Sequence, residues 1–275
     1  MGIIRPVSAK QRSDLTGRYL FILALASLCS SCDQWDLAVE IPFIATWNGK
    51  AITCDSVAPA LSDLRFYVSD PQLIDNKGRW HDVRFATEMA WQNDTVALVD
   101  LENGEGECVN GSPEVFSRLV GVALAGEYRG LRFTVGVPFS LNHANPMTAG
   151  PPLDDPHMHW HWRSGYKFLR AGIRTENDGF WLHLGSTGCE GTVGHVTGCR
   201  FPNRIEVMLP DFSPGQSTVA IDLASLTAGV DLGDAVPDDC SSGPAETSCV
   251  APFAALGINH STGKQEGTQR VFSVQ

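Results

Sequence analysis

Three of the eight histidines fall within five residues, at His157, His159 and His161. Side chains two residues apart on a strand point to the same face, so an extended segment would bring these three imidazoles together. Their Cα atoms would be about 6.5 to 7 Å apart, which lets two imidazoles reach one ion at about 2.0 to 2.1 Å. Imidazole ligands suit copper and zinc, and the soft thioether of Met158 beside them favours copper.

Further imidazoles and indoles surround this run in the sequence. Met158, Trp160 and Trp162 alternate with the three histidines and would occupy the opposite face of the strand. His143 and His183 offer two more imidazole ligands, whereas the other three histidines are expected at the surface: His81, His195 and His260. An alternative stays open, in which the tryptophans belong to a core and the three histidines line a solvated sheet face without a metal.

Signatures of enzymes were not found in the sequence. It has no Gly-x-Ser-x-Gly elbow, no His-Glu-x-x-His and no glycine-rich phosphate loop. We therefore expect a protein that is not itself an enzyme. Two rival functions remain: an extracytoplasmic copper or zinc enzyme using His143, His159 and His183, and a metal-free binding module with a stacking platform of Trp160, Trp162 and Trp181.

Short stretches of alternating apolar and polar residues indicate the elements that must hold these side chains. Such alternation, bounded by Gly, Pro, Asn and Asp, predicts strands; it occurs at 37–41, 64–68, 131–137, 205–209 and 219–223. With 27 Gly and 16 Pro spread along the chain, the pattern predicts an all-β domain, an immunoglobulin-like β-sandwich or barrel with long disulfide-stapled loops.

Helical patterns are weak and confined to short segments. Turns of helix are expected at 61–64, 112–119 and 223–227, the second because Ser112 can cap a helix and Pro113 suits its first position. Long loops are expected at 138–158 and 185–203, and stapled coil from residue 233 to the end.

Six of the eight cysteines lie beyond residue 32, an even number that in an exported chain predicts three disulfides. Cys189 with Cys199 and Cys240 with Cys249 would close short loops, which leaves Cys54 with Cys108; this is one of fifteen arrangements. The spacings do not match those of a zinc-thiolate site.

The first 31 residues have the order of a secretory signal. Basic residues precede the apolar run 19–28, which is too short to span a bilayer and leads into Ser30-Ser31-Cys32. We expect 1–31 to be a signal and 32–275 a single domain, exported to the periplasm. Cys32 resembles the acylated cysteine of a bacterial lipoprotein, which would tether the protein to a membrane; an ordinary cleaved signal is the alternative.

The charge balance bears on the class of partner. The chain has 20 basic and 31 acidic residues, a net charge of −11, and no basic cluster beyond residue 18. Nucleic-acid binding is therefore not expected.

Several motifs in a consistent order resemble the metallo-mystery pair four-Cys-motif family, the copper proteins called MbnP-like. The most specific are Trp160-x-Trp162 followed by Gly165–Phe168, and His183–Cys189. The others are Leu64–Val68, Leu141–His143 and Asn203–Val207.

The resemblance implies a periplasmic β-sandwich that binds copper and is paired with a MauG-like dihaem enzyme of the cytochrome c peroxidase type. In such pairs the enzyme oxidises a tryptophan of the copper protein to kynurenine, and copper binding depends on that change. Here the modified residue would be Trp160 or Trp162, with Trp160 favoured. Copper acquisition, storage or delivery would be the role. In a regular strand Trp160 points away from His159 and His161, so its copper partners would come from His143 and His183; alternatively a bulge mixes the two faces.

Overall fold

The computed structural model describes residues 36–176, 179–232 and 239–275. The predicted signal and Cys32 lie outside the described residues. The described residues all belong to one compact unit. None of its described helices is long and apolar enough to cross a bilayer.

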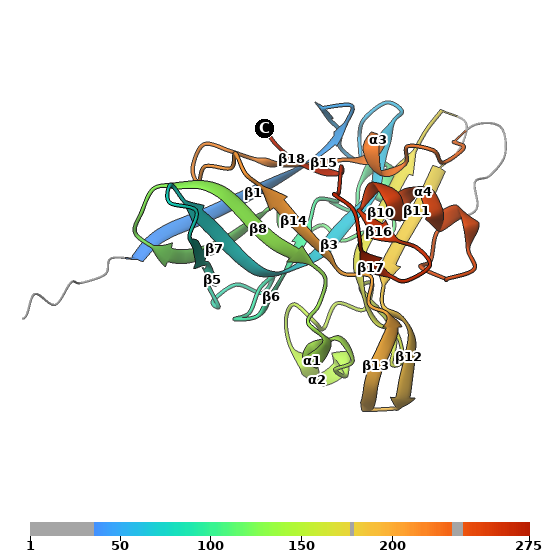
Figure 1. Cartoon of the computed structure of the whole chain (residues 1–275). Coiled ribbons are helices and arrows are strands. Elements are labelled where there is room, and N and C mark those ends of the chain that lie inside the picture. The colour runs from blue at the N-terminus through green and yellow to red at the C-terminus, as the bar shows by residue number, and fades with distance from the viewer. Residues whose placement is uncertain (1–35, 177–178, 233–238) are drawn as a thin grey trace, which may run out of the picture. The chain divides into compact units, whose positions relative to one another are not determined.

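Two sheets form the body of this unit (Figure 1). The six-stranded sheet has the order β18-β15-β1-β7-β5, with β2 paired to β1. Its strands are β1 (Asp36–Trp47), β2 (Lys50–Ala51), β5 (Arg84–Phe85), β7 (Arg118–Leu124), β15 (Val219–Asp222) and β18 (Phe272–Val274). Strand β1 pairs in parallel with β15 and antiparallel with β7.

The eight-stranded sheet has the order β11-β10-β3-β8-β14. The short strands β4 and β6 also pair with β3, and β9 pairs with β10. Its strands are β3 (Ala60–Asp75), β4 (Trp80–Asp82), β6 (Val96–Asp100), β8 (Tyr128–Val135), β9 (His159–His161), β10 (Gly165–Arg174), β11 (Gly179–Gly185) and β14 (Ile205–Leu209).

Aromatic side chains join the two sheets in the main core. Phe43 of β1 makes edge contacts with Phe66 of β3 and Phe133 of β8, with ring centroids 5.4 and 5.9 Å apart. All three are buried, as expected where the inner faces of two sheets pack together. The predicted all-β sandwich is therefore confirmed, and each of the five predicted strands lies within an observed strand or overlaps one.

A second, smaller core lies on the outer face of the eight-stranded sheet. Tyr67, Leu98 and Phe168 of that sheet pack with Leu153 and Met158 of the segment 138–158. This segment carries the short helices α1 (Phe139–Asn142) and α2 (Pro146–Ala149). The sheet is thus covered on both faces in this region.

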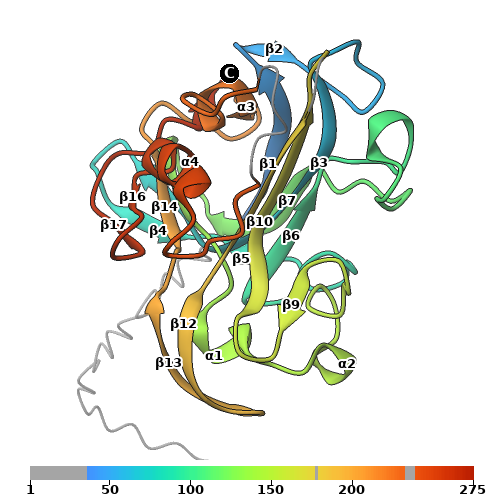
Figure 2. The ribbon, with the colours of Figure 1, turned by 90° about the vertical axis from the view of Figure 1, so that its right-hand side faces the viewer.

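Two hairpins and two helical segments complete the described chain. The hairpin of β12 (Thr187–Thr192) and β13 (His195–Phe201) projects beside α1, as Figures 1 and 2 show. The others are α3 (Leu223–Leu226), α4 (Val250–Ala255), β16 (Ile258–Asn259) and β17 (Lys264–Gln265), with 3-10 turns at Gly106–Cys108 and Thr247–Cys249.

Four local predictions differ from the structure. Residues 61–64 lie within β3, and 112–119 form a loop that leads into β7. Residues 185–203 form the β12–β13 hairpin rather than a long loop. The described part of the C-terminal segment contains α4 and three strands, of which β18 pairs with β15. The short helix expected at 223–227 is present as α3.

Three disulfides join Cys54 with Cys108, Cys189 with Cys199 and Cys240 with Cys249. These are the pairs that the short-loop arrangement predicted. Such bonds are typical of proteins outside the cytoplasm.

Candidate metal centre

Strand β11 places His183 on the outer face of the eight-stranded sheet. Phe180, Leu182 and Leu184 are buried in the main core, so the residues between them point the other way. Strand β11 is the last on the main path of this sheet. The backbone of Cys240 pairs with β11: it accepts from the His183 amide at 2.8 Å and donates to the Trp181 carbonyl at 2.9 Å. A disulfide fixes Cys240 in turn, so the backbone at His183 is held on both sides.

Two indoles flank the His183 ring. The ring of Trp160 meets it edge-on with centroids 6.2 Å apart, and the ring of Trp181 lies 6.3 Å away at a tilt. Trp160 packs on Gly185, where a Cβ would lie 3.1 Å from the indole. Trp181 packs on Gly172 in the same way. Each indole therefore packs against the backbone of a glycine, and His183 lies between the two indoles.

The Nε2 atom of His183 is buried and has no hydrogen-bond partner among the described residues. Burial, with smaller contributions from Lys167, Arg170 and Arg65, lowers the pKa of His183 to about 4. The imidazole is therefore neutral at ordinary pH, which is the state that a metal ligand requires. An unpartnered buried nitrogen costs stability, so it points to a ligand that completes it.

Charged side chains fill the outer face of the sheet beside His183. Arg65, fully buried, donates from Nε and Nη2 to Asp63 at 3.0 and 2.6 Å. Arg170, the register partner of His183, lies 3.0 Å from the same carboxylate. Glu102 is 3.6 Å from Arg65 Nη1. Carboxylates thus offset the guanidinium charges near the site.

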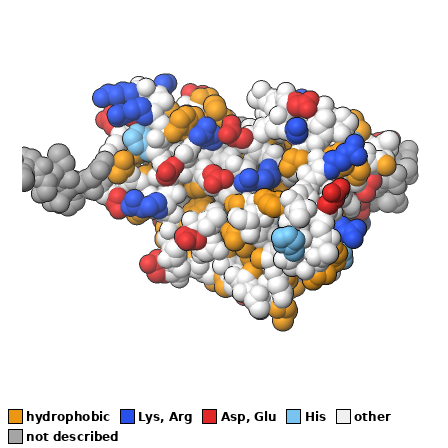
Figure 3. Space-filling view, turned by 60° about the horizontal axis from the view of Figure 1, so that its bottom comes forward, with side chains coloured by type: hydrophobic (Ala, Val, Ile, Leu, Met, Phe, Trp, Pro, Cys, Tyr) orange, Lys and Arg blue, Asp and Glu red, His pale blue; other side chains and the backbone are white. Residues whose placement is uncertain are grey.

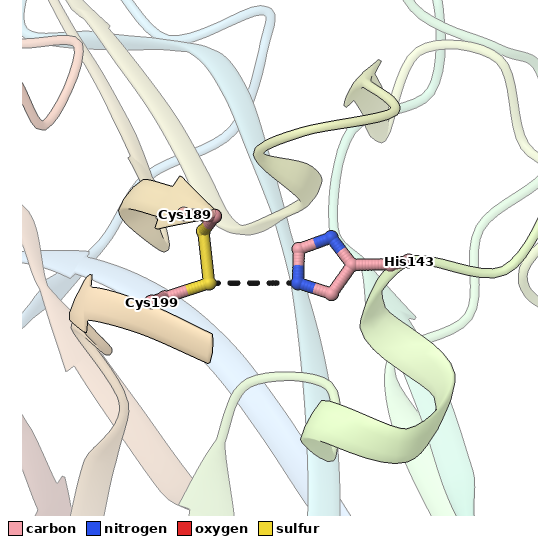
Figure 4. Close-up of side chains that lie close together, drawn as sticks. All are labelled: His143, Cys189 and Cys199. Carbon is pink, nitrogen blue, oxygen red and sulfur yellow. Dashed lines mark hydrogen bonds between the residues drawn. A yellow bond between two sulfur atoms is a disulfide. The ribbon is translucent and has the colours of Figure 1, made fainter. Parts of the chain in front are cut away.

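His143 follows α1 and lies in a different setting. Its Nδ1 atom is 3.3 Å from the Trp162 carbonyl oxygen, and its Nε2 atom is 3.5 Å from the sulfur of Cys199 (Figure 4). Burial lowers the pKa of His143. Since a carbonyl only accepts, Nδ1 carries the proton, and the lone pair of Nε2 accepts a long hydrogen bond from Asn142 Nδ2 at 3.3 Å. His143 thus approaches the Trp162 backbone and the disulfide.

Asn142 ties three of the sequence motifs together. Its side chain accepts from the amide of Tyr166 at 3.0 Å and donates to Ser186 Oγ at 2.8 Å. Gly165 leaves room for this packing, because a Cβ there would lie 2.1 Å from the Asn142 carbonyl oxygen. The segments around His143, Trp162 and His183 are therefore fixed relative to one another.

The three histidines of the dense run have different surroundings. His157 precedes β9 and bonds through its amide and ring to Asp155. His159 packs edge-on against Tyr166, and burial lowers its pKa. His161 is exposed and accepts from the amide of Arg163. The strand expected to align all three begins only at His159.

Two clusters of three potential ligands involve cystine sulfurs. One joins His143 with Cys189 and Cys199, and the other joins Glu246 with Cys240 and Cys249. In both, the sulfurs are bonded to each other and carry no thiolate, which is the form that binds metal.

The end of the molecule that carries α1, α2 and the β12–β13 hairpin comes forward in Figure 3. Much of this face is uncharged, with acidic and basic side chains interspersed.

Comparisons with known proteins identify the family of this chain. The family model of MbnP matches residues 36–242. The chain belongs to the MbnP family. A solved structure, MbnP from Methylosinus trichosporium, is 27% identical, has a TM-score of 0.74 and aligns over 87% of this chain and 98% of that one. The comparison with curated proteins gave no match. The resemblance inferred from the motifs is confirmed.

The sequence did not predict the charged residues that surround the candidate site. Asp63, Arg65 and Arg170 alternate with core residues, a pattern that suggests a solvated face, yet the segment 138–158 covers that face. Of the histidines expected at the surface, only His195 is exposed. His81 bonds to Asp75, and His260 bonds to the Gly243 carbonyl.

Proposed function

We propose that this MbnP-family chain is an exported copper-binding protein whose metal centre is built on His183 and Trp160. The observation that supports this most is the buried Nε2 atom of His183, neutral and unpartnered between two indoles. Histidine nitrogen of this kind suits copper. The protein is not itself an enzyme in this proposal.

Trp160 becomes a ligand only after oxidation. An indole nitrogen is a donor and offers no lone pair, whereas kynurenine has an aryl amine and a ketone. Two molecules of peroxide convert the indole to N-formylkynurenine and leave two of water. Hydrolysis then releases formate and leaves the amine. A MauG-like dihaem partner enzyme would carry out the oxidation.

Trp160 is favoured over Trp162 because of its neighbours. The Trp160 ring contacts His183, whereas the Trp162 ring lies beside His161 and under the guanidinium of Arg163. A new amine on residue 160 would therefore form next to the unpartnered imidazole.

His143 is the third ligand of this proposal, because its Nε2 lone pair has only a long hydrogen bond from Asn142 and the same asparagine fixes its segment to that of His183. His159 is half-buried on Tyr166 and remains a further candidate. His157 and His161 are exposed and belong at most to a looser second site.

Export places the protein where the partner would act. The disulfides suit an oxidising compartment, and the segment before Cys32 suits a lipoprotein signal, so we place the mature chain in the periplasm, tethered through Cys32. Its role there would be copper acquisition, storage or delivery.

The test is mass spectrometry and metal analysis of the mature protein from its own cells. The peptide from Met158 to Lys167 should carry kynurenine at Trp160, and fragmentation identifies the residue. Copper content should fall at least tenfold in His183→Ala and stay unchanged in His195→Ala, a matched change at an exposed histidine of the β12–β13 hairpin.

Two outcomes contradict the proposal. An unmodified peptide from cells that express the dihaem partner would leave a plain histidine site, as in a copper or zinc enzyme. Equal metal content in wild type, His143→Ala and His183→Ala would favour a metal-free binding module.

A further inference from the structure

The Cys189–Cys199 disulfide lies against the imidazole of His143. The two cysteines are direct cross-strand partners in the β12–β13 hairpin. His143 approaches from α1, with Nε2 3.5 Å from the sulfur of Cys199 (Figure 4). The nitrogen and both sulfurs lie within 4.8 Å of one another.

The lone pair of His143 Nε2 has only long contacts, one of them with a sulfur that cannot donate to it. The proton of the ring is on Nδ1, which faces the Trp162 carbonyl. A cystine sulfur has no hydrogen. Asn142 Nδ2 donates to Ser186 Oγ at 2.8 Å and, with its second hydrogen, to His143 Nε2 at 3.3 Å, so a metal ion would displace only this long bond. The imidazole is therefore oriented as in metal sites, where a carbonyl fixes one nitrogen and leaves the other free.

The spacing fits a tetrahedral ion. Ligands at about 2.3 Å for sulfur and about 2.0 to 2.1 Å for nitrogen are about 3.5 Å apart across a tetrahedral angle, and the observed nitrogen-to-sulfur distance is 3.5 Å. Two thiolates on one ion would be about 3.8 Å apart.

The Cys189–Cys199 disulfide is more accessible to solvent than the other two disulfides. Cys199 is half-buried and lines a cavity of about 210 Å³ together with Ser186, Thr197 and Gly198. The cysteines of the other disulfides are at most 3% exposed: Cys54, Cys108, Cys240 and Cys249. A small dithiol would therefore reach Cys199 first, since thiol exchange depends on access to the attacked sulfur.

We propose that the Cys189–Cys199 disulfide is reducible and that its two thiols, with His143, then form a second metal site for a thiophilic ion such as Cu(I). A dithiol supplies two electrons and two protons to the cystine and becomes a disulfide itself. Binding of Cu(I) by the two thiols and the neutral imidazole releases those two protons. The site needs only these three side chains, so it forms whether or not Trp160 is oxidised. When the disulfide is reduced, His143 serves this site instead of the centre proposed at His183.

The test uses the mature protein made in cells that lack the dihaem partner enzyme, so Trp160 is not oxidised. The result therefore does not depend on the kynurenine proposal. Limited treatment with dithiothreitol, followed by alkylation and peptide mapping, should label Cys189 and Cys199 first. After removal of the reductant without air, competition with a chromophoric Cu(I) chelator should show one more tightly bound Cu(I) in the reduced protein than in the oxidised protein. Thiolate-to-copper absorption in the ultraviolet should accompany it.

Variants locate the site. The additional Cu(I) should disappear in Cys189→Ser/Cys199→Ser and persist in Cys240→Ser/Cys249→Ser. His143→Gln keeps both cysteines and should weaken binding of the additional Cu(I) at least tenfold. This variant tests the site even if the double cysteine variant fails to fold. Equal Cu(I) binding before and after reduction, earlier labelling of another cysteine pair, or unchanged binding in His143→Gln would overturn the proposal.

Discussion

His183 differs from the other described histidines in what surrounds its Nε2 atom. His81 Nε2 lies 3.1 Å from an Asp75 oxygen, and His260 Nε2 lies 2.9 Å from the Gly243 carbonyl oxygen. Those two imidazoles are satisfied within the fold. The Nε2 atom of His183 is buried without a partner, which costs about 1 to 3 kcal/mol. The metal-binding role proposed for His183 would explain why the fold tolerates this cost.

Replacement of Gly185 tests whether Trp160 must lie where it does. A Cβ at residue 185 would lie 2.8 Å from the Tyr166 carbonyl oxygen and 3.1 Å from the Trp160 ring. Gly185→Ala should therefore displace the indole and lower the free energy of unfolding by about 1 to 3 kcal/mol. Tryptophan fluorescence and chemical denaturation measure the two effects.

The matched control for this glycine lies on the β12–β13 hairpin. A Cβ at Gly198 would have nothing within 4 Å, so Gly198→Ala should change stability by less than about 0.5 kcal/mol. If both variants keep the fluorescence and stability of the wild type, the close packing of Trp160 on residue 185 is not needed.

The ligand candidates could be found from the sequence, but their supporting residues could not. Residue type and spacing single out Trp160 and His183. No local sequence pattern shows that Arg65 and Arg170 lie side by side. Their shared ion pairs with Asp63 depend on the strand register between β3 and β10.

At the scale of elements, the outer face of the eight-stranded sheet is the unexpected feature. Alternation correctly placed Leu64 and Phe66 in the main core, and it left Asp63 and Arg65 on the other face. Alternation alone does not show that a distant segment covers that face. Similarly, residues 112–119 are not helical because the backbone of Phe116 pairs with Asp100, and a Glu102 oxygen accepts from the Ser112 amide.

The pairing of β3 with β6 buries a carboxyl group opposite Arg65. Asp100 is the register partner of Arg65, is fully buried, and has one oxygen without a partner in the described structure. Burial and the nearby Glu102 charge outweigh the effect of Arg65 and raise the pKa of Asp100 to about 8. The folded protein therefore holds this proton at neutral pH, whereas the unfolded chain releases it above about pH 4.

Asp100→Asn should remove the resulting pH dependence. Between pH 4 and 8 the folded wild type binds more protons than the unfolded chain, so its free energy of unfolding falls as pH rises. The variant lacks this term, so its stability relative to wild type should increase with pH over that window, by up to about 1 kcal/mol per pH unit. Urea denaturation at several pH values measures the difference.

A surface carboxylate provides the comparison for Asp100. Asp94→Asn removes a charge at an exposed position, where the carboxylate accepts only from the neighbouring Thr95 hydroxyl, so any slope that it shows reports mainly the loss of net charge. If the Asp100→Asn difference has the same slope as the Asp94→Asn difference, Asp100 is ionised in the folded protein and the inferred burial of a neutral carboxyl is wrong.

At the scale of the whole molecule, the three disulfides connect different kinds of structural element. Cys240–Cys249 fixes the segment along β11, and Cys189–Cys199 joins the strands of one hairpin. Cys54–Cys108 instead joins the segment before β3 to the 3-10 turn after β6, at a sequence separation of 54 residues. The pairing of the cysteines could be predicted because two of the pairs close short loops. The strands and side chains that each disulfide holds in place could not be predicted, since they lie far away in sequence.

The lengths of the closed loops predict how much each bond contributes to stability. Loop-closure entropy gives about 4 kcal/mol for a separation of 54 residues and about 3 kcal/mol for 10. Cys54→Ala/Cys108→Ala should therefore lower the free energy of unfolding by more than Cys189→Ala/Cys199→Ala, because it frees a longer stretch of the unfolded chain and removes two buried side chains from the main core. Urea denaturation under oxidising conditions measures both variants against wild type. The reverse order would mean that the hairpin disulfide stabilises the folded state by holding β12–β13 against His143, and not mainly by restricting the unfolded chain.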